Sequence, residues 1–371
     1  MGPATGAAGV GVLAALAILA LLIVVHEAGH FLAATSQGIR VSSFSVGFGP
    51  LLLQRRVRGV QFALRLIPLG GFVAFPEDDP DAGIDATDPD LLRNRPLGQR
   101  ALVISAGVIA NLLLAWAVLI TQGLVLGIPD GFSPTAGVLV SGVQAGQAAA
   151  RAGLEPGDRL LALDGTPLGG GSQAVQALVQ RVQTSPGQAL TLSLERRGSP
   201  VELTLVPADR DGTGRIGAQL QPDGRETYRP ARSPFEVLAQ ASDDFARITG
   251  RTIDGFRQLL THFGETAGQV SGPVRIVEMG AQLAQQGGGS LYLFTALISI
   301  NLAVLNALPL PLLDGGQLLL LLIEGLRGRP LPERLQLAFT QSGLVLLLGL
   351  SAVLIVRDTS QLTLVRQLLG R

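Results

Sequence analysis

The sequence predicts a polytopic α-helical membrane protein with about four transmembrane helices, a membrane-associated β-hairpin and one inserted α+β domain. Hydrophobic residues make up 47% of the 371 residues and charged residues only 15%, with a mean hydropathy of +0.41, which is high for a soluble protein. Four long apolar segments recur along the chain, each close to the roughly 20 residues that a helix needs to cross a bilayer. Between the second and the third, the chain becomes charged, glycine-rich and alternating, as expected of a folded domain outside the bilayer.

The first span lies within residues 1–38. Gly11 to Val25 is almost entirely apolar, and no ionisable side chain precedes His26. A secretory signal peptide would have a basic start, a shorter apolar run and a cleavage site of small residues. Here the start is uncharged and the run ends in a charged cluster, so we predict a transmembrane helix.

That cluster is His26-Glu27-Ala28-Gly29-His30, which holds two of the three histidines in the chain. In a continuous helix, His26 and His30 lie one turn apart on one face. The pattern is typical of a zinc site in which both imidazoles bind the metal and the glutamate acts on the attacking water. The alternative is a set of polar groups at a helix end, but each costs a few kcal/mol in the membrane unless it is paired. We therefore predict His26 and His30 as metal ligands and Glu27 as the catalytic base.

Residues 39–100 are predicted to contain a β-hairpin and an acidic linker. Gly59 to Ile67 alternates in places, and Pro68 to Gly71 is typical of a turn before the apolar Phe72 to Phe75. Few charges interrupt this part, which indicates a hairpin lying against the membrane or dipping into it. The linker follows from Glu77 to Asp90.

Span two covers residues 101–126 and carries Gly107 and Asn111 one helical turn apart. A small residue in a membrane helix often serves only close helix packing. Packing and a role in the site are therefore both open explanations of this pair.

Residues 135–206 predict a small soluble α+β domain inserted between the spans. We expect strands at 137–140 and 159–163, helices at 148–154 and 172–184, and a hairpin over 189–206. Residues 233–286 follow as an amphipathic helical region. The third histidine, His262, has no partner at ligand spacing and is expected at the surface.

Span three covers residues 291–323 and is interrupted before Asp314. Pro309 and Pro311 cannot continue a helix, so the backbone opens there. Irregular backbone at membrane depth occurs only inside protein or beside a wet cavity, and a carboxylate in such a place is functional by default. Two histidines need a third ligand with one position left open, so we predict that Asp314 completes the metal site.

A second Leu-Asp-Gly, at Leu163 to Gly165, is explained as a plain turn of the charged domain. Span four covers residues 335–356. Eight arginines in 39–100 and three in 324–334, with none before span one, place both segments on the cytoplasmic side. The inserted domain is then extracytoplasmic.

Together, the His26-to-His30 motif, the Asn306-to-Gly316 segment and the inserted domain closely resemble the site-2 protease family of intramembrane zinc metalloproteases, in particular its bacterial regulated-proteolysis branch. Pro68 to Val73 is similar to the membrane-associated hairpin of that family. The motifs Gly107-x-x-x-Asn111 and Ser271-Gly272-Pro273 also stand where the family has motifs. Some members carry two PDZ domains in tandem, whereas this chain has one PDZ-like domain.

The resemblance implies one Zn²⁺ per chain, a location in the bacterial cytoplasmic membrane, and single-span membrane proteins as substrates. Cleavage within a transmembrane segment would follow a first extracytoplasmic cut, as in release of an anti-sigma factor or clearance of signal-peptide remnants. The resemblance also implies substrate-binding roles, which belong to Asn306, Asn111, Gly70, Gly71 and Phe72. Helix packing is the alternative for Asn306.

We expect the hairpin to hold an unwound substrate as an added strand, and the PDZ-like groove, between the 137–143 strand and the 172–184 helix, to read a peptide C-terminus or to exclude untrimmed ectodomains. Two other classes stay open: a silent homologue that only binds membrane peptides, and a metal transporter. The net charge of zero indicates no nucleic-acid partner, and the absence of cysteine excludes thiolate zinc sites and disulfides.

Overall fold

The computed structural model describes residues 3–78, 85, 87–144, 146–196, 198–262, 272–286 and 288–361. Two predicted features lie partly outside these residues, namely positions 79–84 and 86 of the acidic linker and Ser271 of the Ser-Gly-Pro motif. The chain forms two compact units, one made of Met1–Val125 with Arg232–Arg371 and the other of Leu126–Ala231. We describe each unit by itself.

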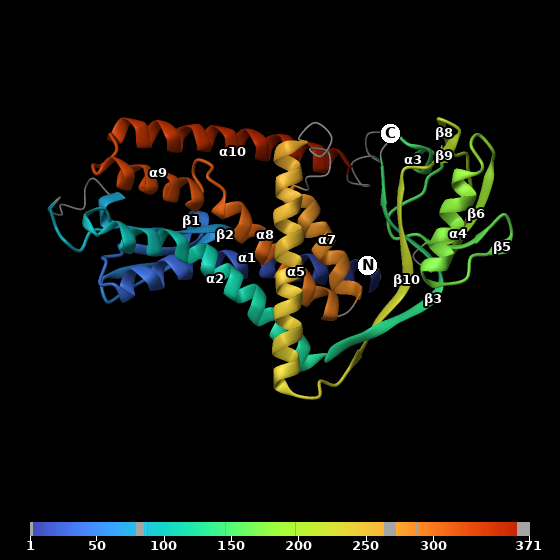
Figure 1. The fold of residues 1–371 in the computed structure, drawn as a ribbon, viewed down its shortest axis with the longest axis horizontal. Helices are drawn as coiled ribbons and strands as arrows, with labels where there is room; N and C mark the ends of the chain where they lie inside the picture. Colours follow the sequence, from blue (N-terminus) through green and yellow to red (C-terminus); the bar gives the residue numbers. More distant parts are fainter. Residues whose placement is uncertain are drawn as a thin grey trace. The chain divides into compact units, whose positions relative to one another are not determined.

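The first unit is helical, with one long β-hairpin (Figure 1). Its helices are α1 (Pro3–Ser36), α2 (Leu97–Val125), α5 (Pro234–Thr261), α7 (Pro273–Gln286), α8 (Gly288–Ala307), α9 (Asp314–Arg327) and α10 (Glu333–Gln361). The hairpin is made of β1 (Ser43–Val57) and β2 (Val60–Ala74), and two short 3-10 turns follow at Pro76–Asp78 and Leu92–Asn94.

Within the described residues, four helices are long and apolar enough to cross a membrane. They are Gly9–Ser36, Leu97–Val125, Gly289–Ala307 and Arg334–Val356. The chain is therefore an integral membrane protein, in agreement with the four predicted spans. The predicted third span, 291–323, divides into α8 and α9, because the helix stops at Ala307 and begins again at Asp314.

The break between α8 and α9 follows from proline and glycine chemistry. Pro309 and Pro311 have no backbone N–H to continue the helical ladder. A Cβ on Gly315 would stand 2.3 Å from the carbonyl oxygens of Ala307 and Leu308, and one on Gly316 only 2.0 Å from the oxygen of Leu310. Only glycine at both positions lets α9 start so tightly against the loop, and this start fixes the place of Asp314.

Helix α5 is amphipathic, as predicted, and packs against α2 and α8. Ser233 caps it by accepting a hydrogen bond from the Glu236 amide at 3.2 Å, and Pro234 follows at the first helical position. The core that the three helices share is apolar and consists of Ala115, Leu119, Ala241, Ile248, Ala296 and Ile300. This packing places α2 firmly beside the helix that precedes the Pro-broken loop.

The hairpin curls back on itself. Residues 43–46 of β1 pair with 71–74 on one side and with 61–64 on the other. The opposite edge of 71–74 carries no strand partner among the described residues. The rest of the hairpin has exposed leucines at 51–53 and stays apart from the core, as expected of a hairpin that meets lipid.

The second unit is an α+β fold whose sheet has the order β10-β3-β4-β6-β7, with β5 added beside β4 and a separate β8–β9 pair. Its elements are β3 (Ile128–Val143), α3 (Ala148–Arg151), β4 (Arg159–Leu163), β5 (Thr166–Pro167), α4 (Gly171–Gln183), β6 (Leu190–Arg196), β7 (Ser199–Leu205), β8 (Ala208–Arg210), β9 (Thr213–Arg215) and β10 (Ala218–Arg229). The unit is therefore larger than the predicted 135–206, because β10 returns to pair with β3 along nearly its whole length.

A buried ion pair holds the turn before β4 to β6. Asp158 is 1% exposed and accepts two hydrogen bonds of 2.7 Å from the guanidinium of Arg196. The same carboxylate caps the turn by accepting from the Glu155 amide. These bonds raise the pKa of Arg196 above its ordinary value, so the guanidinium stays charged.

Candidate metal centre and binding cavities

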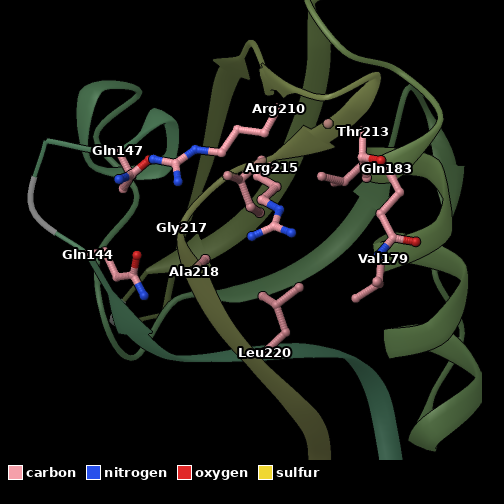
Figure 2. A pocket seen from close by; sticks show the side chains of 13 residues that line it. Gln144, Gln147, Val179, Gln183, Arg210, Thr213, Arg215, Gly217, Ala218 and Leu220 are labelled. Atoms are coloured by element: carbon pink, nitrogen blue, oxygen red, sulfur yellow. The ribbon is translucent and has the colours of Figure 1, made fainter. Parts of the chain in front are cut away.

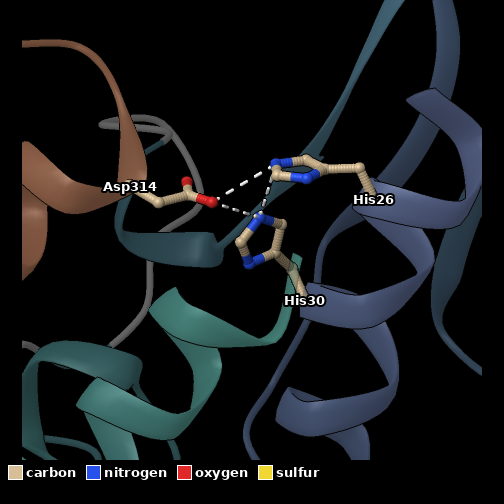
Figure 3. A group of neighbouring side chains, drawn as sticks. All are labelled: His26, His30 and Asp314. Carbon is tan, nitrogen blue, oxygen red and sulfur yellow. Dashed lines mark hydrogen bonds and ion pairs between the residues drawn. The ribbon is translucent and has the colours of Figure 1, made fainter. Parts of the chain in front are cut away.

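His26, His30 and Asp314 converge in the first unit (Figure 3). The two histidines come from consecutive turns of α1, and Asp314 is the first residue of α9. His26 Nε2 and His30 Nε2 are 3.3 Å apart, and Asp314 Oδ2 lies 3.3 Å from the first and 3.4 Å from the second. The three predicted ligand atoms thus form a nearly equilateral triangle.

This triangle fits a tetrahedral zinc ion. With metal–ligand bonds of about 2.0–2.1 Å, two ligands of a tetrahedron stand about 3.3–3.4 Å apart. The measured separations fall in this interval. Two imidazole nitrogens and one carboxylate oxygen are also the donor set of hydrolytic zinc sites, which leave a fourth position for water or substrate.

The outer nitrogens of both histidines face α2. His30 Nδ1 lies 2.8 Å from the carbonyl oxygen of Val103 and can only donate to it. In the neutral imidazole, His30 Nε2 is then the unprotonated nitrogen, the form that binds a metal. His26 Nδ1 lies 3.2 Å from the side-chain amide of Asn111.

Two glycines allow the helices to come this close. A Cβ on Gly107 would stand 2.3 Å from His30 Nε2 and 2.7 Å from His26 Cε1. A Cβ on Gly29 would stand 2.4 Å from the carbonyl oxygen of Ala106. Gly107 therefore leaves room for both imidazoles, while Gly29 brings α1 against α2.

Glu27 faces the curled end of the hairpin. Its carboxylate is hydrogen-bonded to the backbone of Val73. A Cβ on Gly71 would stand 3.1 Å from Glu27 Cγ and 2.9 Å from the Ser45 carbonyl oxygen. Gly70 has φ of +109° and lies against the ring of Phe48, where a side chain would collide. This pair of glycines lets the 71–74 edge approach the glutamate.

A cavity of about 590 Å³ opens over the metal centre. Its walls contain all four predicted catalytic and metal residues, from His26 to Asp314, together with Gly70, Gly71, Phe72 and Asn306. Asn111 does not belong to these walls and is fully buried. The prediction that Asn111 touches substrate is therefore corrected, since its amide contacts His26 instead.

A second cavity, of about 380 Å³, lies in the other unit between α4 and the β9–β10 segment (Figure 2). The predicted groove strand, 137–143, is an inner strand of the sheet, because it pairs with β10 on one side and, at Val138 and Leu139, with β4 on the other. The edge strand next to it is β10, and β7 forms the other edge of the sheet. Arg215 points into the cavity and Arg210 lies at its rim, and neither joins the ion pairs made by the described residues.

The sequence did not reveal some of the supporting contacts. Val103 acts through its backbone carbonyl, so no side-chain pattern could have indicated it. Arg100 and Glu324 form a partly buried ion pair, 2.6 Å at its shorter contact, that ties α2 to α9. The position of Glu324 directly after an apolar run was the one sign in the sequence that this carboxylate needs a partner.

Comparison with known proteins places the chain among membrane metalloproteases. The sequence model described as Peptidase family M50 matches residues 14–350. A Nostoc sp. protein, all3971, whose assigned name is that of a zinc metalloprotease, is 50% identical over 352 residues, covering 95% of this chain and 96% of its own. The Arabidopsis thaliana membrane metalloprotease ARASP is 44% identical over 363 residues, with coverage of 96% and 80%. The Escherichia coli regulator of sigma-E protease RseP is 30% identical over 444 residues, with coverage of 93% and 97%.

Proposed function

The chain belongs to peptidase family M50, the site-2 protease family of zinc metalloproteases, and on this premise we propose that it is an endopeptidase that cuts peptide bonds inside transmembrane segments. The observation that carries the proposal is the triangle of His26, His30 and Asp314. His26 and His30 belong to an apolar helix able to span a bilayer. A hydrolytic site built on a membrane-spanning helix is expected to act on peptide bonds that lie within the membrane.

The residues divide the chemistry as follows. His26, His30 and Asp314 would hold one zinc per chain, and zinc, when bound, polarises a carbonyl group and lowers the pKa of water. Glu27 takes the proton from the attacking water and returns it to the leaving amine. Its hydrogen bond to the Val73 backbone orients the carboxylate for this transfer.

Substrate binding is assigned to the 71–74 edge. A transmembrane substrate is helical, so its carbonyl groups are hydrogen-bonded and it must unwind before attack. Apart from the Val73 backbone group that Glu27 engages, this edge of 71–74 has no strand partner among the described residues and offers its backbone to an extended strand. This edge reaches the cavity through Gly71 and Phe72, and Asn306 stands in the same walls to hold the added strand.

Metal removal tests the proposal. The purified protein in liposomes should cleave a single-span membrane protein, lose this activity after treatment with a zinc chelator, and regain it when zinc is added back. The reason is that the three converging side chains would hold the ion that the hydrolysis needs. Cleavage that persists in the metal-depleted protein would contradict a metalloprotease, and zinc uptake without any cleavage would favour a silent peptide-binding homologue.

We propose the bacterial cytoplasmic membrane as the location, with the Leu126–Ala231 unit extracytoplasmic. Support comes from the arginines of 39–100, because short loops rich in arginine stay on the cytoplasmic side. A cysteine introduced at position 199 of this Cys-free chain should react with a membrane-impermeant reagent in intact cells, whereas one at position 85 should not. Reaction at 85 alone would reverse the topology.

The Leu126–Ala231 unit, which we propose to be PDZ-like, would select substrates by their free C-termini. Peptide C-termini commonly dock as an added strand beside an edge such as β10. The cavity next to β10 contains apolar Val179 and Leu220 for a side chain and the guanidinium group of Arg215 for a carboxylate. A new C-terminus left by a first extracytoplasmic cut would offer both a terminal side chain and a free carboxylate to this cavity.

Binding of a short apolar peptide tests this selection. Arg215→Ala should weaken binding of the peptide with a free carboxylate by about 10-fold or more, since hydrogen bonds to charged groups contribute about 1.5–3 kcal/mol. Arg181→Ala is the matched control, because Arg181 pairs with Asp164 outside the cavity. Equal affinity of the wild type for amidated and free-carboxylate peptides would rule out recognition of a C-terminus.

A further inference from the structure

We infer that Asn111 is a positioning residue for His26. Its side-chain oxygen accepts a hydrogen bond from His26 Nδ1–H, so that His26 Nε2 stays free for zinc. The inference deepens the proposed function and rests on it. It gives the Gly107-x-x-x-Asn111 motif one role within the metal centre. That role is one of the two explanations that the sequence left open, a role in the site rather than helix packing alone.

Asn111 has no freedom to serve elsewhere. Its side chain is 0% exposed and its amide lies 3.2 Å from His26 Nδ1. Its own backbone carbonyl accepts a hydrogen bond of 2.8 Å from Ser299, which is also fully buried. Helix α8 thus fixes the turn of α2 that presents the amide to the imidazole.

The direction of the hydrogen bond follows from metal chemistry. A neutral histidine that binds zinc through Nε2 carries its proton on Nδ1, and this N–H needs an acceptor. With the amide nitrogen toward His26, two donors would face each other, and Asn111 Oδ1 is buried without a hydrogen-bond partner among the described residues. Rotation of the amide by half a turn puts Oδ1 beside Nδ1 with the heavy atoms unchanged, because the two orientations are nearly isosteric.

The same face of α2 serves the other histidine. Val103, Gly107 and Asn111 follow one another at four-residue spacing and so lie along one stripe of the helix. Val103 offers its carbonyl to His30, Gly107 leaves space for both rings, and Asn111 offers its amide to His26. Both imidazoles therefore receive an acceptor at Nδ1 from one helix, which fixes both tautomers for the metal.

The test measures zinc affinity of the full-length protein by competition with a chelator. Asn111→Leu, similar in size but without an acceptor, should raise the zinc dissociation constant by about 10–100-fold, the usual effect of losing such a partner. Asn111→Asp, which keeps an acceptor at the same place, should stay within about threefold of the wild type. Leu113→Ala, on the exposed side of the same helix, is the control and should change nothing.

A separate measurement of folding distinguishes a packing defect from a loss of zinc affinity. Thermal unfolding of the zinc-free proteins shows whether Asn111→Leu is folded, and if it is not, Asn111→Asp decides alone, because a residue needed only for packing would not tolerate a buried carboxylate. Asn111→Leu with wild-type affinity, or Asn111→Asp as weak as Asn111→Leu, would overturn the inference. After either of these results, the proposed function still stands if His30→Ala loses zinc. A wild-type protein that binds no zinc would contradict both the inference and the proposed function.

Discussion

Replacing Glu27 by Gln should abolish proteolysis while the protein keeps its zinc. Glutamine has nearly the same shape and its amide oxygen can still accept from the Val73 backbone, so the cavity should not change. It cannot take up a proton, however, and general acid–base catalysis typically contributes about 10²–10⁴ to the rate. Cleavage of a single-span substrate in liposomes should therefore fall by about this factor or more.

Zinc content serves as the control for this variant. If Glu27→Gln has lost its zinc, the loss of activity reflects a structural role of Glu27 at the metal site and not proton transfer. Zinc content and cleavage activity are therefore measured on the same sample. Activity above about a tenth of the wild type, with zinc retained, would show that another group moves the proton. The cavity walls contain no other glutamate among the described residues.

Replacing Asp314 by Asn should remove the metal. An amide is a much weaker zinc ligand than a carboxylate, and two imidazoles alone leave the ion held by too few protein groups. We expect the wild type to contain about one zinc per chain and Asp314→Asn to lose it during buffer exchange, with an affinity loss above the roughly 10–100-fold typical of a merely supporting residue. Elemental analysis of the purified proteins provides the measurement.

Asp164→Asn is the matched control, because Asp164 belongs to the second Leu-Asp-Gly. Asp164 has φ of +49° in the turn between β4 and β5, a conformation that asparagine tolerates. Its carboxylate accepts from the Thr191 amide and pairs with Arg181, and no metal ligand is near it among the described residues. Zinc loss in Asp164→Asn together with retention in Asp314→Asn would reverse the ligand assignment.

Local chemistry made the metal centre predictable. The spacing of His26 and His30 fixes their common face, and the prolines before Asp314 force an opening in the helix, so both ligand sources were visible in the sequence. The four apolar helices were equally visible, since length and composition decide them. The shape of the triangle of ligand atoms could not be predicted from the sequence, because it depends on how α1, α2 and α9 pack in three dimensions.

Long-range pairing explains the parts that sequence reasoning missed. The return of β10 to β3 joins residues 75 to 101 positions apart, and no turn signal connects them. The predicted groove was therefore placed beside an inner strand, and the predicted domain ended too early, at 206. Asn111 was misplaced for a similar reason, because only the packing of α2 on α1 shows that its amide meets His26 rather than substrate.

The central claim is cleavage within the membrane, and mass spectrometry of the products tests it most directly. Wild-type protein and Glu27→Gln are each incubated in liposomes with a single-span substrate already trimmed on the extracytoplasmic side. The wild type should give fragments whose new termini lie inside the apolar segment, and Glu27→Gln should give none. Termini found only in the soluble parts of the substrate, or the same termini with Glu27→Gln, would contradict the account.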